Sequence, residues 1–107
     1  YADPKRSVEV VNLRVKAIGL TKKPALPEME PGGRDARAAR IDRRPTCFGK
    51  KNSLADVYDR GRLRPGNFLV GPALVLDYES TAVVAEGFGC RVDRHGNLIL
   101  TRLRQRR

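Results

Sequence analysis

The first part of the chain alternates between apolar and polar positions in the manner of a β-strand. In residues 8–18 (VEVVNLRVKAI), every second position of the central stretch is apolar. The apolar positions are Val11, Leu13, Val15 and Ala17, and the polar residues Asn12, Arg14 and Lys16 lie between them. A period of two places the two sets on opposite faces of an extended chain. The pattern therefore predicts a strand over 8–18 that buries one face and ends at Gly19.

The second half of the chain consists of short apolar runs separated by turn residues. Gly and Pro mark the turns: Pro65-Gly66 closes the segment 59–66, Gly71-Pro72 separates two runs, and Gly96 ends an Arg-His-Gly hairpin turn. The β candidates are 46–48, 57–58, 68–70, 73–76, 81–85, 90–93 and 97–100. Their regular spacing predicts a mainly β fold, a small barrel or sandwich of about six to seven short strands.

The middle of the chain, about residues 20–55, is largely free of these patterns. Three prolines and a Gly-Gly pair fall within 21–33, a density that neither a helix nor a central strand tolerates. Residues 34–44 are rich in Arg and offer only Ala and one Ile as apolar residues. We predict a long, mobile basic loop within a single domain that spans 1–107, and a flexible basic tail at about 101–107. Because the chain opens on Tyr1, we also expect it to be a piece of a longer polypeptide.

The formal net charge of +10 is concentrated in two segments. Clustered Lys and Arg bind nucleic acids because they release counterions from the phosphates. The alternative function is therefore a small basic β-barrel that binds nucleic acid through Arg34–Lys51 and Arg102–Arg107. In such a barrel, however, the charge should lie on the strands beside exposed aromatic side chains. Here it lies in a predicted loop and tail, so we expect no nucleic-acid partner.

The side chains that usually carry catalysis are scarce. His95 is the single histidine and falls in a predicted turn, where no nucleophile can be placed beside it. Cys47 and Cys90 have neither a Cys-x-x-Cys nor a Cys/His spacing, so reduced thiols are expected rather than a zinc site. The longest nearly apolar stretch, 68–76, is too short to cross a membrane. The sequence predicts no catalytic residue, no metal ligand and no membrane partner.

Several ordered motifs resemble the C-terminal end of the hydantoinase A / oxoprolinase family. The first is EVVNLRV at 9–15; VYDR at 57–60, LRPG at 63–66 and GPA at 71–73 follow, and the last are DYESTAVV at 77–84 and GNLIL at 96–100. The resemblance covers 1–19 and 56–100, and the segment 20–55 shows little of it. It implies ATP-dependent enzymes that open the rings of hydantoins or 5-oxoproline, with relatives that carboxylate acetone or acetophenone. It further implies that ATP and a divalent cation bind an actin-like core preceding this region, and that no cofactor binds here.

The resemblance implies an accessory or interface domain of an ATP-dependent cyclic amide hydrolase, which we expect to be inactive in isolation and cytoplasmic. Its expected partners are the rest of its own chain and a second hydantoinase-type subunit or another copy. Polar residues held by adjacent strands or turns are the candidates for interface or substrate-facing contacts. They are Asn12, Arg14, Asp59, Arg60, Ser80 and Thr81.

Overall fold

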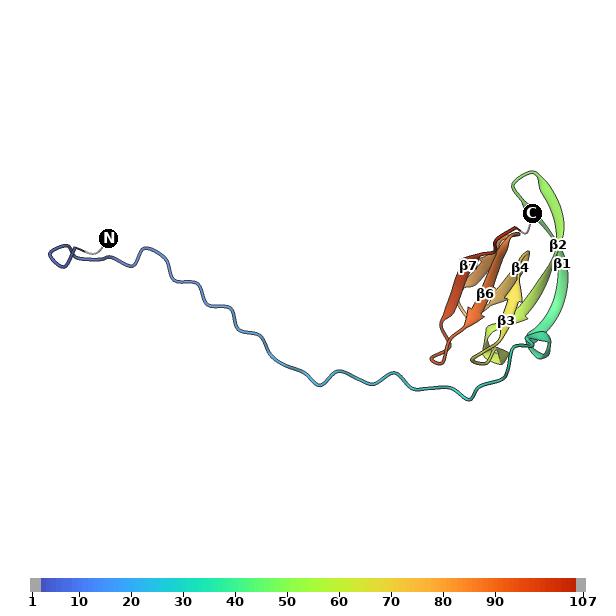
Figure 1. Cartoon of the computed structure of the whole chain (residues 1–107), viewed down its shortest axis with the longest axis horizontal. Helices are drawn as coiled ribbons and strands as arrows, with labels where there is room; N and C mark the ends of the chain where they lie inside the picture. The colour runs from blue at the N-terminus through green and yellow to red at the C-terminus, as the bar shows by residue number, and fades with distance from the viewer. Residues whose placement is uncertain (1–2, 106–107) are drawn as a thin grey trace.

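The computed structural model describes residues 3–105, in which two facing β-sheets form an open sandwich (Figure 1). The first sheet has the order β1-β2-β4-β5 and the second the order β3-β6-β7. The strands are β1 (Arg40–Phe48), β2 (Lys51–Asp59), β3 (Phe68–Val70), β4 (Ala73–Leu76), β5 (Thr81–Val84), β6 (Phe88–Val92) and β7 (Leu98–Arg102). Two single-turn 3₁₀ helices, η1 (Arg37–Ala39) and η2 (Arg60–Arg62), flank the β1–β2 hairpin. Within 3–105, no helix has the length and apolar character needed to cross a membrane.

Small aliphatic side chains from both sheets form the core. Val75 and Val84 of the four-stranded sheet belong to the same buried cluster as Leu69, Cys90 and Val92 of the three-stranded sheet. The prediction of a mainly β fold with six to seven strands is confirmed, and the sheets remain two separate layers rather than a closed barrel. The runs at 68–70, 73–76, 81–84 and 98–100 all lie in strands, as predicted.

The prediction of a long loop over 20–55 is wrong from residue 40 onward. Residues 40–59 form a hairpin whose two strands pair antiparallel from Arg40↔Tyr58 to Phe48↔Lys51, with a turn at Gly49 (φ +63°). β1 is exposed over most of its length, so it has no apolar alternation that sequence patterns could detect. Its backbone is held by β2, whose Ala55 and Val57 are fully buried.

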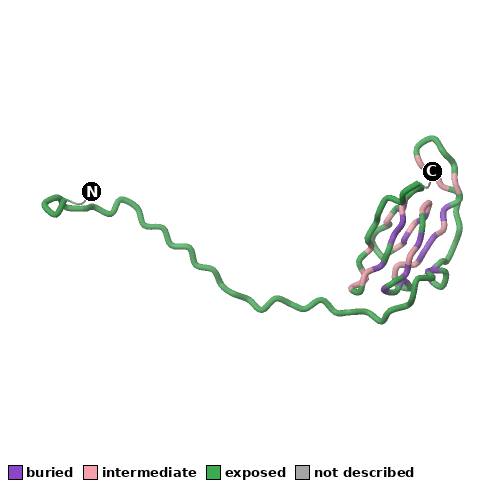
Figure 2. The backbone as a smooth tube through the Cα atoms, in the orientation of Figure 1, coloured by how far each residue is buried: buried purple, intermediate pink, exposed green. Residues whose placement is uncertain are grey.

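Residues 3–35 form an exposed arm that leads away from the sandwich (Figure 2). The prediction of a strand over 8–18 is therefore wrong: these residues are extended but pair with no other strand. An isolated strand leaves its backbone groups to water and buries nothing, so a strand forms only where a sheet edge receives it.

The arm is attached to the sandwich through its last residues. Backbone hydrogen bonds run from Met29 N to the Arg94 carbonyl and from Gly32 N to the Pro65 carbonyl, both 3.0 Å, and the Arg34 carbonyl accepts from Phe68 N at 2.9 Å. At the other end of the chain, the predicted tail 101–107 begins later than expected, because Thr101 and Arg102 belong to β7. Residues 106–107 of that prediction lie outside the described residues.

Candidate interface at one end of the sandwich

Three connections meet around the side chain of Arg60. Its guanidinium lies 3.4 Å from Asp77 Oδ2, in the β4–β5 turn, and 3.5 Å from the carbonyl oxygen of Gly96, in the β6–β7 turn. Arg60 comes directly after β2, which pairs parallel with β4 so that Asp59 lies opposite Leu76. This pairing brings Arg60 to Asp77, and one cation thereby links the two sheets.

The segment that contains Arg60 is fixed by its neighbour Asp59. Asp59 Oδ1 accepts a hydrogen bond from Gly61 N at 2.9 Å and so caps η2. Its other carboxylate oxygen lies 3.6 Å from Arg62 Nε. Asp59 thus acts on the local backbone, and its exposed carboxylate lies beside Arg60 at the same end of the molecule.

The β6–β7 turn is organised by Asp93. Its Oδ1 accepts from His95 N (2.9 Å) and Asn97 N (2.8 Å), and its Oδ2 accepts from Asn97 Nδ2 (2.9 Å). The side-chain hydrogen bond from Asn97, followed by the backbone donors, holds the pKa of Asp93 below its ordinary value of 3.8. Gly96 adopts φ +83°, as the predicted Arg-His-Gly turn requires.

The same turn also receives the end of the arm. His95 Nδ1 lies 3.2 Å from the Pro27 carbonyl oxygen, and Arg94 Nε lies 3.9 Å from Glu28 Oε1. The interpretation of His95 as a turn residue is confirmed. Its ring contacts the arm rather than a nucleophile.

The six predicted contact residues fall into two places. Asp59, Arg60 and the Ser80-Thr81 pair lie around the polar end just described, where the Ser80 carbonyl accepts from Asp77 N at 2.9 Å. Asn12 and Arg14 lie in the exposed arm and contact none of them. Their roles in binding remain predictions.

Sequence reasoning missed Asn67, a residue that organises the site from within. Its side chain is 4% exposed and makes three hydrogen bonds. Oδ1 accepts from Arg64 N at 2.7 Å, and Nδ2 donates to the carbonyl oxygens of Gly33 (2.7 Å) and Asp35 (3.3 Å). Asn67 therefore fixes the turn before β3 and the base of the arm together. An Asn directly after a Pro-Gly turn was the available sequence signal.

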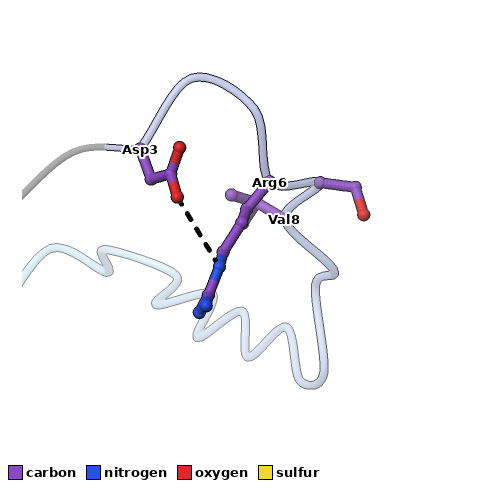
Figure 3. Close-up of a pocket in the computed structure, with 4 residues that line it drawn as sticks. Asp3, Arg6 and Val8 are labelled. Carbon is purple, nitrogen blue, oxygen red and sulfur yellow. Dashed lines mark ion pairs between the residues drawn. The ribbon is translucent and has the colours of Figure 1, made fainter.

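The part of the chain described by the structure holds no cluster of metal-ligating side chains. A surface hollow at the start of the arm is formed by one local turn, with Asp3 and Arg6 paired across it at 3.6 Å (Figure 3). A second lies along Arg102–Gln105. Both thiols are free: Cys47 is exposed, and burial raises the pKa of the Cys90 thiol in the core.

Several cations of the basic segment 34–51 are paired with carboxylates, some within the hairpin and some (Asp35 and Glu86) outside it. These carboxylates lie beside the guanidinium and ammonium groups at hydrogen-bond distance. The pairs are Arg37–Asp35 (2.7 Å), Arg43–Asp56 (2.8 Å), Arg44–Asp42 (2.7 Å) and Lys51–Glu86 (2.9 Å). Such pairing lowers the charge available to phosphates, and the nucleic-acid alternative receives no support from the structure.

An open sandwich with a polar end and a long exposed arm defines a small accessory β-domain. The family profile described as "Hydantoinase/oxoprolinase C-terminal domain" matches residues 2–103. The chain belongs to this family. The match includes residues 20–55, so the resemblance extends through the segment in which the sequence motifs showed little of it.

Three curated proteins are similar over nearly the whole chain. An uncharacterised protein of Methanocaldococcus jannaschii is 30% identical over 95% of the chain. The caprolactamase subunit alpha of Pseudomonas jessenii is 26% identical over 94%, and the acetone carboxylase beta subunit of Xanthobacter autotrophicus is 33% identical over 89%. The chain covers only 15%, 15% and 14% of these relatives, respectively. Two of them are thus subunits of larger enzymes.

A solved structure shares the fold. It is a nucleotide-free acetone carboxylase, from work on ATP-dependent acetone carboxylation, and it superposes with a TM-score of 0.69 at 32% identity. The superposition covers 76% of this chain and 12% of the acetone carboxylase chain. The similarity therefore concerns one small part of a much larger polypeptide.

Proposed function

We propose that this domain is a non-catalytic accessory module of an ATP-dependent enzyme subunit that hydrolyses a cyclic amide. Its role is to dock onto the rest of that enzyme and to hold the subunit in its working assembly. The observation that carries this proposal is the arm with its exposed apolar side chains, in a family domain that spans about 15% of its relatives. The similarity to a caprolactamase subunit supports a cyclic amide as the proposed substrate class.

A second candidate activity is the ATP-dependent carboxylation of a small ketone. It is favoured by the 33% identity to an acetone carboxylase subunit and by the superposition with acetone carboxylase. Both candidates require activation of a carbonyl or amide group, and both place ATP and a divalent cation on parts of the enzyme outside this domain. The domain's role as a docking module is the same in either case.

The proposed partners are the remainder of the subunit and a second subunit or another copy. The two subunit names among the relatives support a multi-subunit enzyme. We infer that it works in a reducing compartment such as the cytoplasm, because an exposed free thiol such as Cys47 persists where disulfides do not form.

The test compares the full-length subunit with a form that lacks this domain, each supplied with its neighbouring subunit. ATP-dependent opening of hydantoin, 5-oxoproline and caprolactam, and carboxylation of acetone, are measured for both. We expect activity on one substrate class to require the domain, and the 107-residue chain alone to be inactive. Full activity of the truncated enzyme would refute the proposal.

The nucleic-acid alternative is tested on the same material. Retention of the 107-residue chain on immobilised DNA is measured at about 150 mM salt, where weak phosphate contacts are already screened. We expect no retention. Strong retention that falls steeply with added salt would favour the basic-barrel function.

A further inference from the structure

The arm holds more of the exposed large apolar side chains than any other segment of the described chain. Its large aliphatic residues lie on a short run, and each is far from buried. The exposed fractions are 91% for Val8, 82% for Val10, 94% for Val11, 81% for Leu13, 85% for Val15 and 70% for Ile18. So many exposed large apolar side chains within eleven residues are typical of an interaction site in a soluble protein.

We propose that residues 8–18 form a β-strand added to an exposed sheet edge of the larger subunit, outside this domain. Its backbone groups would complete that sheet, as in β-augmentation. Val11, Leu13 and Val15 would be buried on one face, and Arg14 and Lys16 would face acidic side chains on the other. This inference rests on the proposed function, since it needs the larger subunit.

The sandwich offers no suitable edge for its own arm. A strand over 8–18 is about 36 Å long at roughly 3.3 Å per residue, and an edge must match it to satisfy its backbone. Of the four edge strands, β3, β5 and β7 have three, four and five residues. Only β1, with nine, approaches the required length.

Charge argues against β1. It carries three arginines (Arg40, Arg43, Arg44) and one aspartate. The nearby carboxylates of Asp42 and Asp56 are already paired with Arg44 and Arg43, so Arg14 and Lys16 of the arm would lie beside cations without a free carboxylate to pair with. Like charges across neighbouring strands are destabilising. The same repulsion opposes pairing with a second copy, because every copy carries a net charge of +10. An edge with acidic neighbours on another part of the enzyme fits both the length and the charge.

The family match includes the arm, and the lengths of the relatives leave room for a receiving sheet outside this domain. The family match begins at residue 2 and so includes the whole run 8–18. The structural superposition covers 76% of the chain, which leaves room for the arm outside the superposed part. The relatives contain several times as much polypeptide as this domain, enough to supply the receiving sheet.

Hydrogen–deuterium exchange of the full-length subunit, compared with the 107-residue chain, tests the proposal. The 8–18 amides should exchange at least about 100-fold more slowly in the full-length subunit, since paired strands open rarely. Leu13→Ser should reduce this protection by about ten- to hundredfold, as expected for the loss of one buried Leu. Leu20→Ser is the matched control: Leu20 is 96% exposed, lies beyond Gly19 and should leave the protection unchanged.

Each other outcome overturns the inference. Fast exchange of 8–18 in the full-length subunit excludes an added strand. Protection in the 107-residue chain that rises with its concentration means strand exchange between copies, and protection independent of concentration means pairing with its own sandwich. The activity of the subunit that lacks this domain separates the two proposals. If residues 8–18 are protected in the full-length subunit but the truncated subunit is fully active, the added strand stands and only the accessory function is refuted.

Discussion

Replacing Asn67 tests whether one buried amide holds the arm to the sandwich. Asn67→Ala removes three hydrogen bonds, each worth about 0.5–1.5 kcal/mol net. The three partners are the backbone N–H of Arg64 and the carbonyl oxygens of Gly33 and Asp35. Because the two carbonyls lie in an exposed segment, water can replace part of what they lose. We expect the free energy of unfolding to fall by about 2–3 kcal/mol.

Urea unfolding followed by circular dichroism measures this change. The midpoint should fall with little change in its slope, since the surface exposed on unfolding is nearly the same. Asn52→Ala is the control: Asn52 lies near the exposed end of the β1–β2 hairpin and should alter stability by less than about 0.5 kcal/mol. Equal effects of the two substitutions would refute the argument from burial and hydrogen bonding.

Asn67→Asp separates the hydrogen bond that the Asn67 side chain accepts from the two that it donates. The introduced carboxylate can still accept from Arg64 N, but it faces the two carbonyl oxygens that the amide had served as a donor. Burial and these oxygens should raise the folded-state pKa of that carboxyl above its unfolded value. Compared with the wild-type chain, the variant should therefore lose least stability at low pH and progressively more as the pH rises through the raised pKa. A pH-independent variant would contradict this reading.

Three further outcomes follow from particular contacts. In Gly71→Ala the new Cβ would lie 2.5–2.6 Å from backbone atoms at the end of β5, so unfolding should become easier by about 3 kcal/mol in the same urea assay. Because the pKa of Asp93 is depressed, its hydrogen bonds should hold above pH 3.8 and be lost as the pH falls through the lowered value, which the Asn97 amide shift reports by NMR. Iodoacetamide should modify Cys47 in the folded chain and reach Cys90 only on unfolding, as mass spectrometry can show; equal rates would contradict the burial of Cys90.

The strands that sequence patterns predicted are those whose side chains enter the core. β4 alternates buried Ala73 and Val75 with half-buried neighbours, and the turn at Gly96 has the positive φ that its sequence predicts. Only the end of β1, the predicted run at 46–48, was found in this way, and its first six residues were missed. β1 is a mostly exposed edge strand that contains Pro45. It forms because it pairs with β2, and its own residues show no apolar alternation.

In the candidate site, too, features fixed by neighbouring residues could be predicted, and features that depend on the pairing of distant strands could not. The positions of Asp59 and of the His95 turn follow from neighbouring residues, and local reasoning placed both. The ion pair between Arg60 and Asp77 depends on the parallel pairing of β2 with β4, which no short window of sequence contains. The prediction for residues 8–18 was wrong for a related reason. Their alternation predicts a strand, but the sequence does not show whether a sheet edge is available to pair with it.

The segment between residues 8–18 and the hydrogen bonds of Asn67 limits where the receiving sheet edge can lie. Pro24, Pro27 and Pro31 favour an extended, semi-rigid backbone, and the chain from Gly19 to Gly33 can span roughly 45 Å. A flexible linker would let the arm fold back onto β1, whereas a stiff one holds it away from the sandwich. On this view, core residues determine stability and residues 8–18 determine docking. Leu13→Ser should therefore leave the unfolding midpoint of the 107-residue chain unchanged, even though it lowers the protection of the 8–18 amides from exchange in the full-length subunit. Asn67 contributes to both stability and docking. Loss of its hydrogen bonds would free the base of the proline-rich segment, which would then no longer hold residues 8–18 away from the sandwich.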